Sequence, residues 1–189
     1  MTKCRICKSD FVRRRPLQPV CEDIRCIMAN LEQKKAKKLE QQARQKRKEI
    51  REQREKLKSR ADWLREAQAA VNAYRRELFR DEPCISCGRH HQGQYHAGHY
   101  LSRAARPELR FVEENIWKQC QPCNVHLSGN QVEFRKALVK RIGIKLVEWL
   151  EGAHPAAKYT IEDAKRIKTE YKEKIKHLKE RRREQNAFG

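Results

Sequence analysis

The sequence predicts a mainly α-helical protein with small β-hairpins that are stabilised by bound metal. Its eight cysteines fall into two groups of four, each group built from closely spaced pairs. Residues 31–58 contain no Gly or Pro and are rich in Lys, Arg, Glu, Gln and Ala, a composition that favours helix. Charged residues make up 37% of the 189 residues, which leaves too little apolar material for one large core. We therefore expect small domains that are joined by solvated helix.

The charge of the chain indicates a polyanionic partner. Lys and Arg number 45 against 25 Asp and Glu, a formal net charge of +20, and nucleic acid is the expected partner. No apolar run approaches the ~20 residues of a membrane span, and the N-terminus lacks the apolar stretch of a signal peptide. We expect a soluble, intracellular protein without a membrane partner. In a reducing compartment, paired cysteines are better explained by metal than by disulfides.

Residues 1–30 are predicted to form an N-terminal zinc-binding module. Phe11 and Val20 are their only obvious core residues, so a segment this short needs metal in order to fold. The alternative is a frayed terminus with reduced, unliganded cysteines, because the spacing of the second pair is loose. The predicted ligands are Cys4, Cys7, Cys21 and Cys26.

Residues 31–60 are predicted to be a basic, charged helix. One heptad column stays apolar through Ala36, Ala43, Ile50 and Leu57, but its partner column carries Lys, Gln and Arg. A single stripe favours a solvated helix, with at most weak dimerisation, over a committed coiled coil.

Residues 61–82 are predicted to be an amphipathic helix that docks on the core. Ser59 and Asp62 form a capping-box pattern at its start, and Asp81-Glu82-Pro83 ends it. Its apolar face consists of Leu64, Ala67, Val71, Tyr74 and Leu78.

Residues 83–130 are predicted to be a zinc-clamped unit of two strands and a helix. Two Cys-x2-Cys turns supply four ligands for a tetrahedral zinc, the segment between them fits a β-hairpin, and a helix is expected from Asn124. In an alternative arrangement, His96 and His99 complete one zinc site with the first pair, and His126 joins the second pair. The favoured zinc ligands are Cys84, Cys87, Cys120 and Cys123.

Residues 131–189 are predicted to form C-terminal helices with a basic tail. Asn130 and Glu133 make a capping-box pattern for the first helix, which Gly143 closes. Thr160 and Asp163 make another for the last helix, which ends in a basic run that suits nucleic acid or a disordered end.

The polar residues of the core suggest phosphodiester hydrolysis, which needs an activated water, a metal and a rigid frame. His99 is the candidate base, and Asn124 with His96 or His126 are candidate ligands of a catalytic ion. Asn115 is placed to bridge backbone groups and hold the orientation of the histidine, although it could also be an ordinary turn residue. Trp117, Tyr95 and Tyr100 are expected to be core residues rather than platforms for stacked bases.

Basic side chains in four regions are candidate contacts to phosphate. They are Arg13, Arg14, Arg15, Lys46, Arg47, Lys48, Arg103, Arg181, Arg182 and Arg183.

Several motifs of the core resemble the NinG (Rap) family of lambdoid phages. They are Cys84-Ile-Ser-Cys87-Gly88, Ala97-Gly98-His99-Tyr100, Leu109-Arg110-Phe111, Asn115-Ile116-x-Lys118-Gln119-Cys120-x2-Cys123-Asn124 and Ser128-Gly129-Asn130. The resemblance runs from about Trp63 to the last helix, and motifs of this length rarely recur by chance. The N-terminal tetrad and the basic helix are similar to the family in layout only.

The resemblance implies a phage- or prophage-encoded recombination endonuclease, active in the cytoplasm of a bacterial host. Its substrates would be branched DNA such as Holliday junctions and D-loops, and a homodimer would match the two-fold symmetry of a junction. The core is also similar to the ββα-metal nuclease fold (HNH, His-Me finger) of endonuclease VII resolvases. That likeness implies that His99 activates water and Asn124 binds a catalytic Mg2+ or Mn2+.

The chain departs from those resolvases in one residue, because they carry an Asp directly before the base histidine and this sequence has Gly98. His96, which would favour Mn2+ or another softer metal, or Glu113 or Glu114 could replace the missing carboxylate. Two further functions fit the composition. One is a non-catalytic zinc protein that binds DNA and assists recombination, and the other is an RNA-binding module.

Overall fold

The protein folds into two units, Met1–Lys58 and Ser59–Gly189, and each is described by itself. The computed structural model describes residues 1–187. The chain is mainly helical, with two small antiparallel sheets, as predicted. The last two residues of the expected C-terminal region 131–189 lie outside the described residues.

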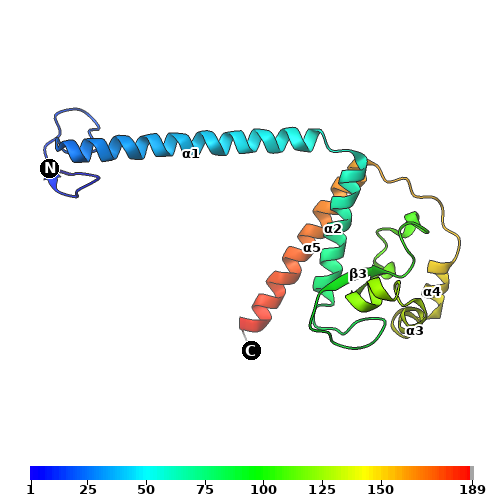
Figure 1. Cartoon of the computed structure of the whole chain (residues 1–189). Coiled ribbons are helices and arrows are strands. Elements are labelled where there is room, and N and C mark those ends of the chain that lie inside the picture. Colours follow the sequence, from blue (N-terminus) through cyan, green and yellow to red (C-terminus); the bar gives the residue numbers. More distant parts are fainter. Residues whose placement is uncertain (188–189) are drawn as a thin grey trace. The chain divides into compact units, whose positions relative to one another are not determined.

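The first unit consists of a small sheet and one long helix, α1 (Ile24–Lys56) (Figure 1). Strands β1 (Thr2–Lys3) and β2 (Asp10–Phe11) pair antiparallel. Asp23 caps the helix by accepting a hydrogen bond from the Arg25 N–H at 2.8 Å. The helix therefore begins seven residues before the predicted Leu31, because this cap was not identified in the sequence. Every residue of positions 31–54 is exposed, as expected of a solvated helix.

In the second unit, α2 (Arg60–Leu78) and α5 (Ile161–Ala187) lie side by side (Figure 1). Both predicted capping boxes at their starts are confirmed, Ser59 with Asp62 and Thr160 with Asp163. The predicted apolar face of α2 packs against α5 as well as against the second sheet. The buried residues of this contact are Leu64, Ala67, Val71, Ala164, Ile167 and Tyr171.

The second sheet is the predicted hairpin, formed by β3 (Tyr95–His99) and β4 (Ile116–Cys120). The strands are antiparallel, and Tyr95 pairs with Cys120 while His99 pairs with Ile116. Their connection contains two short 3-10 turns, η1 (Pro107–Leu109) and η2 (Glu113–Asn115). The hairpin therefore brings the start of β3, which carries His96, next to Cys120 of the second cysteine pair.

The helix expected from Asn124 is a single π-helical turn, η3 (Pro122–His126). Positive φ angles at Ser128, Gly129 and Asn130 break the chain directly after it. Left-handed backbone of this kind cannot continue a right-handed helix. The predicted helix is thus split into η3 and a separate helix, α3 (Gln131–Ile142).

The predicted capping box of Asn130 with Glu133 is wrong. Asn130 has a φ of 45° and makes no side-chain cap bond, and its amide Nδ2 lies 3.6 Å from Cys123 Sγ instead. After α3, Gly143 with a φ of 81° turns the chain into α4 (Ile144–Glu151). A second core forms beneath these helices and includes Trp117 and Tyr100, which confirms them as core residues.

Candidate functional site

The four core cysteines lie together at the base of the hairpin. The sulfur atoms of Cys84, Cys87, Cys120 and Cys123 are all within 4.8 Å of one another. Four sulfurs at ~2.3 Å from a tetrahedral zinc are about 3.8 Å apart, and Cys87 Sγ is 4.0 Å from Cys120 Sγ. The group therefore fits a structural zinc. His96 and His99 are outside it, so the alternative Cys2His2 arrangement is wrong.

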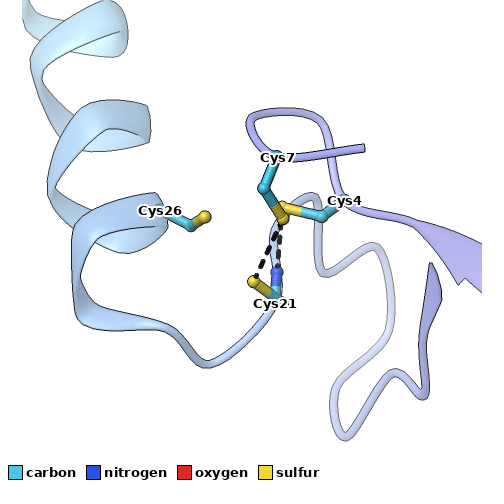
Figure 2. A group of neighbouring side chains, drawn as sticks. All are labelled: Cys4, Cys7, Cys21 and Cys26. Atoms are coloured by element: carbon cyan, nitrogen blue, oxygen red, sulfur yellow. Dashed lines mark hydrogen bonds between the residues drawn. The ribbon is translucent and has the colours of Figure 1, made fainter. Parts of the chain in front are cut away.

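The N-terminal cysteines form a second group of the same kind, shown in Figure 2. Cys26 comes from the first turn of α1, and Cys7 Sγ lies 3.8 Å from Cys21 Sγ. Burial raises the pKa of the Cys4 thiol, but hydrogen bonds from backbone groups, Cys21 first, lower the pKa overall to about 6. Burial raises the pKa of the Cys26 thiol to about 12, so Cys4 is the thiol of this group that loses its proton most readily, as a metal ligand must. This group can hold zinc as well.

His91 is a neighbour of the core tetrad that was not identified in the sequence. Its Nε2 lies 3.2 Å from Cys87 Sγ, and its backbone N–H donates to the Tyr95 hydroxyl at 2.7 Å. The sequence signal that could have identified His91 is its position four residues after Cys87, the second cysteine of a Cys-x2-Cys turn.

An open cleft of about 900 Å³ lies beside the hairpin. Of the predicted catalytic and metal-binding residues, His96, His99 and Asn124 line it, whereas His126 does not and is exposed at the end of η3. Three arginines also line it, Arg76, Arg103 and Arg110, and only Arg103 was identified in the sequence. No Asp or Glu lines the cleft within residues 1–187. Its walls therefore suit an anion.

His99 is held at the edge of the cleft by the backbone. Its Nε2 lies 3.2 Å from the Arg110 carbonyl oxygen, which can only accept a hydrogen bond. The same Nε2 lies 3.4 Å from Gln68 Nε2, which can only donate, so the two neighbours select opposite tautomers of the neutral ring. The tautomer that donates from Nε2 to the shorter contact, the Arg110 carbonyl oxygen, leaves Nδ1 as the basic nitrogen. Burial lowers the pKa of His99 from 6.5 to about 4, and the positive charges of Arg103 and Arg110 add to this effect. The imidazole is neutral at neutral pH.

Arg110 is fixed in turn by α2. Its Nε donates to Gln68 Oε1 and its Nη2 to the Leu64 carbonyl oxygen, both at 3.1 Å. Because Arg110 presents its own carbonyl to His99, helix α2 sets the position of that ring through two hydrogen bonds. Arg110 and Gln68 belong to segments that resemble the family, but neither was predicted as a site residue, since 42 positions separate them.

Asn115 bridges backbone groups, as predicted, and is not an ordinary turn residue. It is fully buried, and its Oδ1 accepts from the Leu101 N–H at 2.8 Å. Its Nδ2 donates to the carbonyl oxygens of Leu101 and Leu109 at 3.0 and 3.2 Å. Asn115 does not line the cleft. It ties the two ends of the connection between the strands, next to the strand that carries His99.

The other basic candidates lie outside the cleft. Arg13 and Arg15 are exposed in the N-terminal loop, and Arg14 there pairs with Glu22 at 3.0 Å. Lys46, Arg47 and Lys48 are exposed on α1, and Arg181 and Arg183 are exposed on α5. Arg182 instead binds the end of α2, where it donates to the Glu77 carbonyl oxygen at 3.0 Å and pairs with Asp81 at 3.2 Å.

Comparison with known proteins gives close relatives in phages. The family described as Bacteriophage Lambda NinG protein matches residues 1–182. Protein ninG of Salmonella phage P22 and protein ninG of Escherichia phage lambda are each 51% identical to this chain over 128 residues. That alignment covers 68% of this chain and 63% of each relative, so the match spans less than two thirds of their length. No solved structure matches the chain significantly. Within residues 1–187, no helix is long and apolar enough to cross a membrane.

Proposed function

Because the chain belongs to the NinG family of lambdoid phages, we propose that it is a metal-dependent endonuclease that cuts branched DNA. Its substrates in this proposal are recombination intermediates such as Holliday junctions and D-loops. The cleft carries the proposal, because His99 and Asn124 line it beside three arginines. In chain order, β3, β4 and η3 follow one another as strand, strand and helical turn. We propose that they are a reduced form of the ββα-metal nuclease core.

His99 is the general base in this mechanism. In the tautomer that donates from Nε2 to the Arg110 carbonyl oxygen, the Nε2 proton stays on the ring, and Nδ1 accepts a proton from the attacking water. A pKa of about 4 keeps the base free of protons at neutral pH but makes it weak. A bound phosphate would neutralise the field of Arg103 and Arg110 and so raise the pKa when substrate is present.

The arginines bind and orient the DNA backbone. Arg103 is exposed at the mouth of the cleft, and Arg76 approaches from α2. Arginine is well suited to phosphate because its planar fork donates two parallel hydrogen bonds. With no carboxylate on the walls formed by the described residues, nothing there repels the anion.

The donors in the cleft fit a divalent cation. The Nε2 of His96 is buried and has no hydrogen-bond partner among the described residues, and Asn124 contributes an amide oxygen to the same cleft. We therefore assign the ion to His96 and Asn124 rather than to the exposed His126. When bound, a divalent ion would stabilise the charge that develops on the phosphate and on the leaving oxygen.

A second function is favoured by one observation. A cleft lined by arginines without a carboxylate also suits a protein that binds branched DNA and assists recombination without cutting it. The two functions differ in what they require of His99, because only the nuclease needs a free imidazole nitrogen at the phosphate.

Cleavage of a labelled four-way junction, compared with linear duplex and with Mg2+ or Mn2+, tests the proposal. We expect the wild type to cut the junction and His99→Ala to bind it, keep its zinc and cut at least about a hundredfold more slowly. His126→Ala is the matched control, since it removes an exposed histidine outside the cleft and should cut normally. If the wild type binds the junction but does not cut it, the binding function is correct. Two chains acting together would cut both strands symmetrically, which the positions of the products would reveal.

A further inference from the structure

Gly98 occupies a position where no side chain fits. A Cβ added there would lie 2.2 Å from Gln119 Oε1 and 3.0 Å from Asn124 Oδ1. Two amide oxygens therefore converge on the site that the missing carboxylate side chain would fill. The Gly98 backbone is not left-handed, so the demand for glycine comes from these two oxygens and not from the φ angle.

The orientation of the Gln119 amide is fixed by its other end. Nε2 donates to Ser86 Oγ at 2.7 Å and to the Gly129 carbonyl oxygen at 2.6 Å. Because a carbonyl can only accept, the nitrogen must be on that side, and Oε1 must point toward Gly98. Gln119 is fully buried, and its Oε1 has no hydrogen-bond partner among the described residues.

A buried polar atom without a partner is rare and needs an explanation. Two such atoms belong to paired residues of the hairpin, because His96 on β3 lies opposite Gln119 on β4 and its Nε2 is also buried and unpartnered. Gln119 Oε1 has lone pairs for a cation, and His96 Nε2 has one in the tautomer that carries its proton on Nδ1. The Asn124 amide oxygen also lies at this position, 3.0 Å from the Cβ site of Gly98, and His96 lines the same cleft as Asn124.

We infer that Gln119 is a ligand of a divalent cation and replaces the carboxylate that Gly98 lacks, together with Asn124 and His96. This inference rests on the proposed function, since it names the ligands of the ion used there. The site differs in charge from a carboxylate site because all three donors are neutral. Gly98 is required so that the Gln119 oxygen can reach the ion.

A neutral set with one imidazole has a definite metal preference. Mg2+ is a hard ion that is usually bound through carboxylates, whereas transition-metal ions accept an imidazole more readily, and Mn2+ among them also suits carbonyl oxygens. The donors therefore favour Mn2+ over Mg2+. Without a negative ligand, binding in the absence of DNA should be weak, and a phosphate of the substrate would supply the missing charge.

Mn2+ binding to the full-length, zinc-loaded protein, followed by electron paramagnetic resonance without DNA, tests the inference. The wild type should bind one Mn2+ that Mg2+ displaces poorly, and Gln119→Met should weaken binding at least about tenfold. Gln92→Met is the matched control, because it makes the same change at an exposed glutamine that does not line the cleft, and it should bind like the wild type. Asn124→Asp adds a charge to the set and should tighten binding by roughly tenfold or more, a gain that misfolding cannot produce.

The inference is overturned if the wild type binds no Mn2+, if Gln119→Met with its full zinc content binds as tightly as the wild type, or if Asn124→Asp does not tighten binding. Junction cleavage, measured in parallel, separates this result from the proposed function. If Mn2+ binds through Gln119 but the junction is not cleaved, the inferred ion site is supported and the proposed nuclease activity is refuted. If Gln119→Met still cleaves the junction, the proposed nuclease activity is supported and the role of Gln119 as a ligand is refuted.

Discussion

Substitution of Gly98 by alanine is expected to destabilise the second unit, although alanine usually stabilises a chain relative to glycine. The new Cβ would meet Gln119 Oε1 at 2.2 Å. The Gln119 side chain cannot simply swing away, because its Nε2 is held by Ser86 and by the Gly129 carbonyl oxygen. Relief of the clash must break these bonds or strain the hairpin.

The expected loss of stability in Gly98→Ala is the sum of opposing effects. Loss of two hydrogen bonds costs about 1 kcal/mol each, and overpacking of a tight site costs about 1–3 kcal/mol in its own right. Because strain and bond loss are alternative ways to relieve one clash, they do not add fully. Alanine also reduces the conformational freedom of the unfolded chain, which stabilises the folded protein by about 0.4–1 kcal/mol. We expect Gly98→Ala to lower the free energy of unfolding by about 2 kcal/mol, or the melting temperature by roughly 8 °C.

Urea denaturation followed by tryptophan fluorescence measures this effect. All three tryptophans, at positions 63, 117 and 149, belong to the second unit and therefore report on it alone. Gly93→Ala is the matched control, because an added Cβ there has nothing within 4 Å, and it should change stability by less than about 0.5 kcal/mol.

The double variant Gly98→Ala with Gln119→Ala locates the cause. If the Gln119 side chain is the obstacle, Gly98→Ala should not lower the free energy of unfolding any further in a protein that already carries Gln119→Ala. The coupling energy between the two substitutions should then be about 2 kcal/mol. A Gly98→Ala protein as stable as the wild type would refute the reasoning. So would strictly additive effects in the double variant.

Three other perturbations have defined outcomes. Cys120→Ser should lower the zinc content from two ions to one and unfold the second unit, which tryptophan fluorescence would detect. Cys7→Ser should also lose one zinc, but it should leave the tryptophan fluorescence unchanged. Because the pKa of His99 is about 4 in the folded chain and near 6.5 unfolded, the unfolded state binds more protons and stability falls as pH falls from 6.5 to 4. The expected loss in the free energy of unfolding between pH 6.5 and 4 is about 3 kcal/mol. Urea titrations at several pH values should show a smaller loss in His99→Gln than in the wild type. Arg75→Met should cost about 3 kcal/mol in the same assay, since Arg75 is buried and donates to the Ile116 carbonyl oxygen at 2.6 Å, whereas Arg76→Met in the cleft should cost little.

Features that depend on local sequence could be predicted. The capping boxes at Ser59 and Thr160 were found because cap and partner lie three residues apart. The metal tetrads were found because each Cys-x2-Cys turn is itself a local structure. Asn130 failed under the same rule, because the left-handed turn after η3 prevents its side chain from reaching the helix. A capping pattern predicts a cap only where the preceding chain can enter the helix in extended backbone.

The residues that shape the cleft could not be found in this way, because their partners are distant in sequence. Arg110 depends on Gln68 and Leu64 in α2, and Gln119 depends on Gly129 beyond the cysteine turn. A buried glutamine in a strand has no pattern of its own, and it becomes informative only once an unpaired oxygen and a glycine without room for a side chain are seen together.

The core tetrad and the cleft share one segment of the chain, and this links the structural zinc that the tetrad fits to the ion that we propose for the cleft. Gln119 directly precedes Cys120, and Asn124 directly follows Cys123, so a zinc that fixes the two cysteines also fixes both amide oxygens. Neutral donors gain little from charge and bind a cation only if their positions are already set, because any freedom they lose on binding subtracts from a small interaction energy. The single turn of η3 is too short to set those positions by helix packing. The tetrad supplies the rigidity instead, and weakening it should loosen the cleft before the rest of the second unit unfolds.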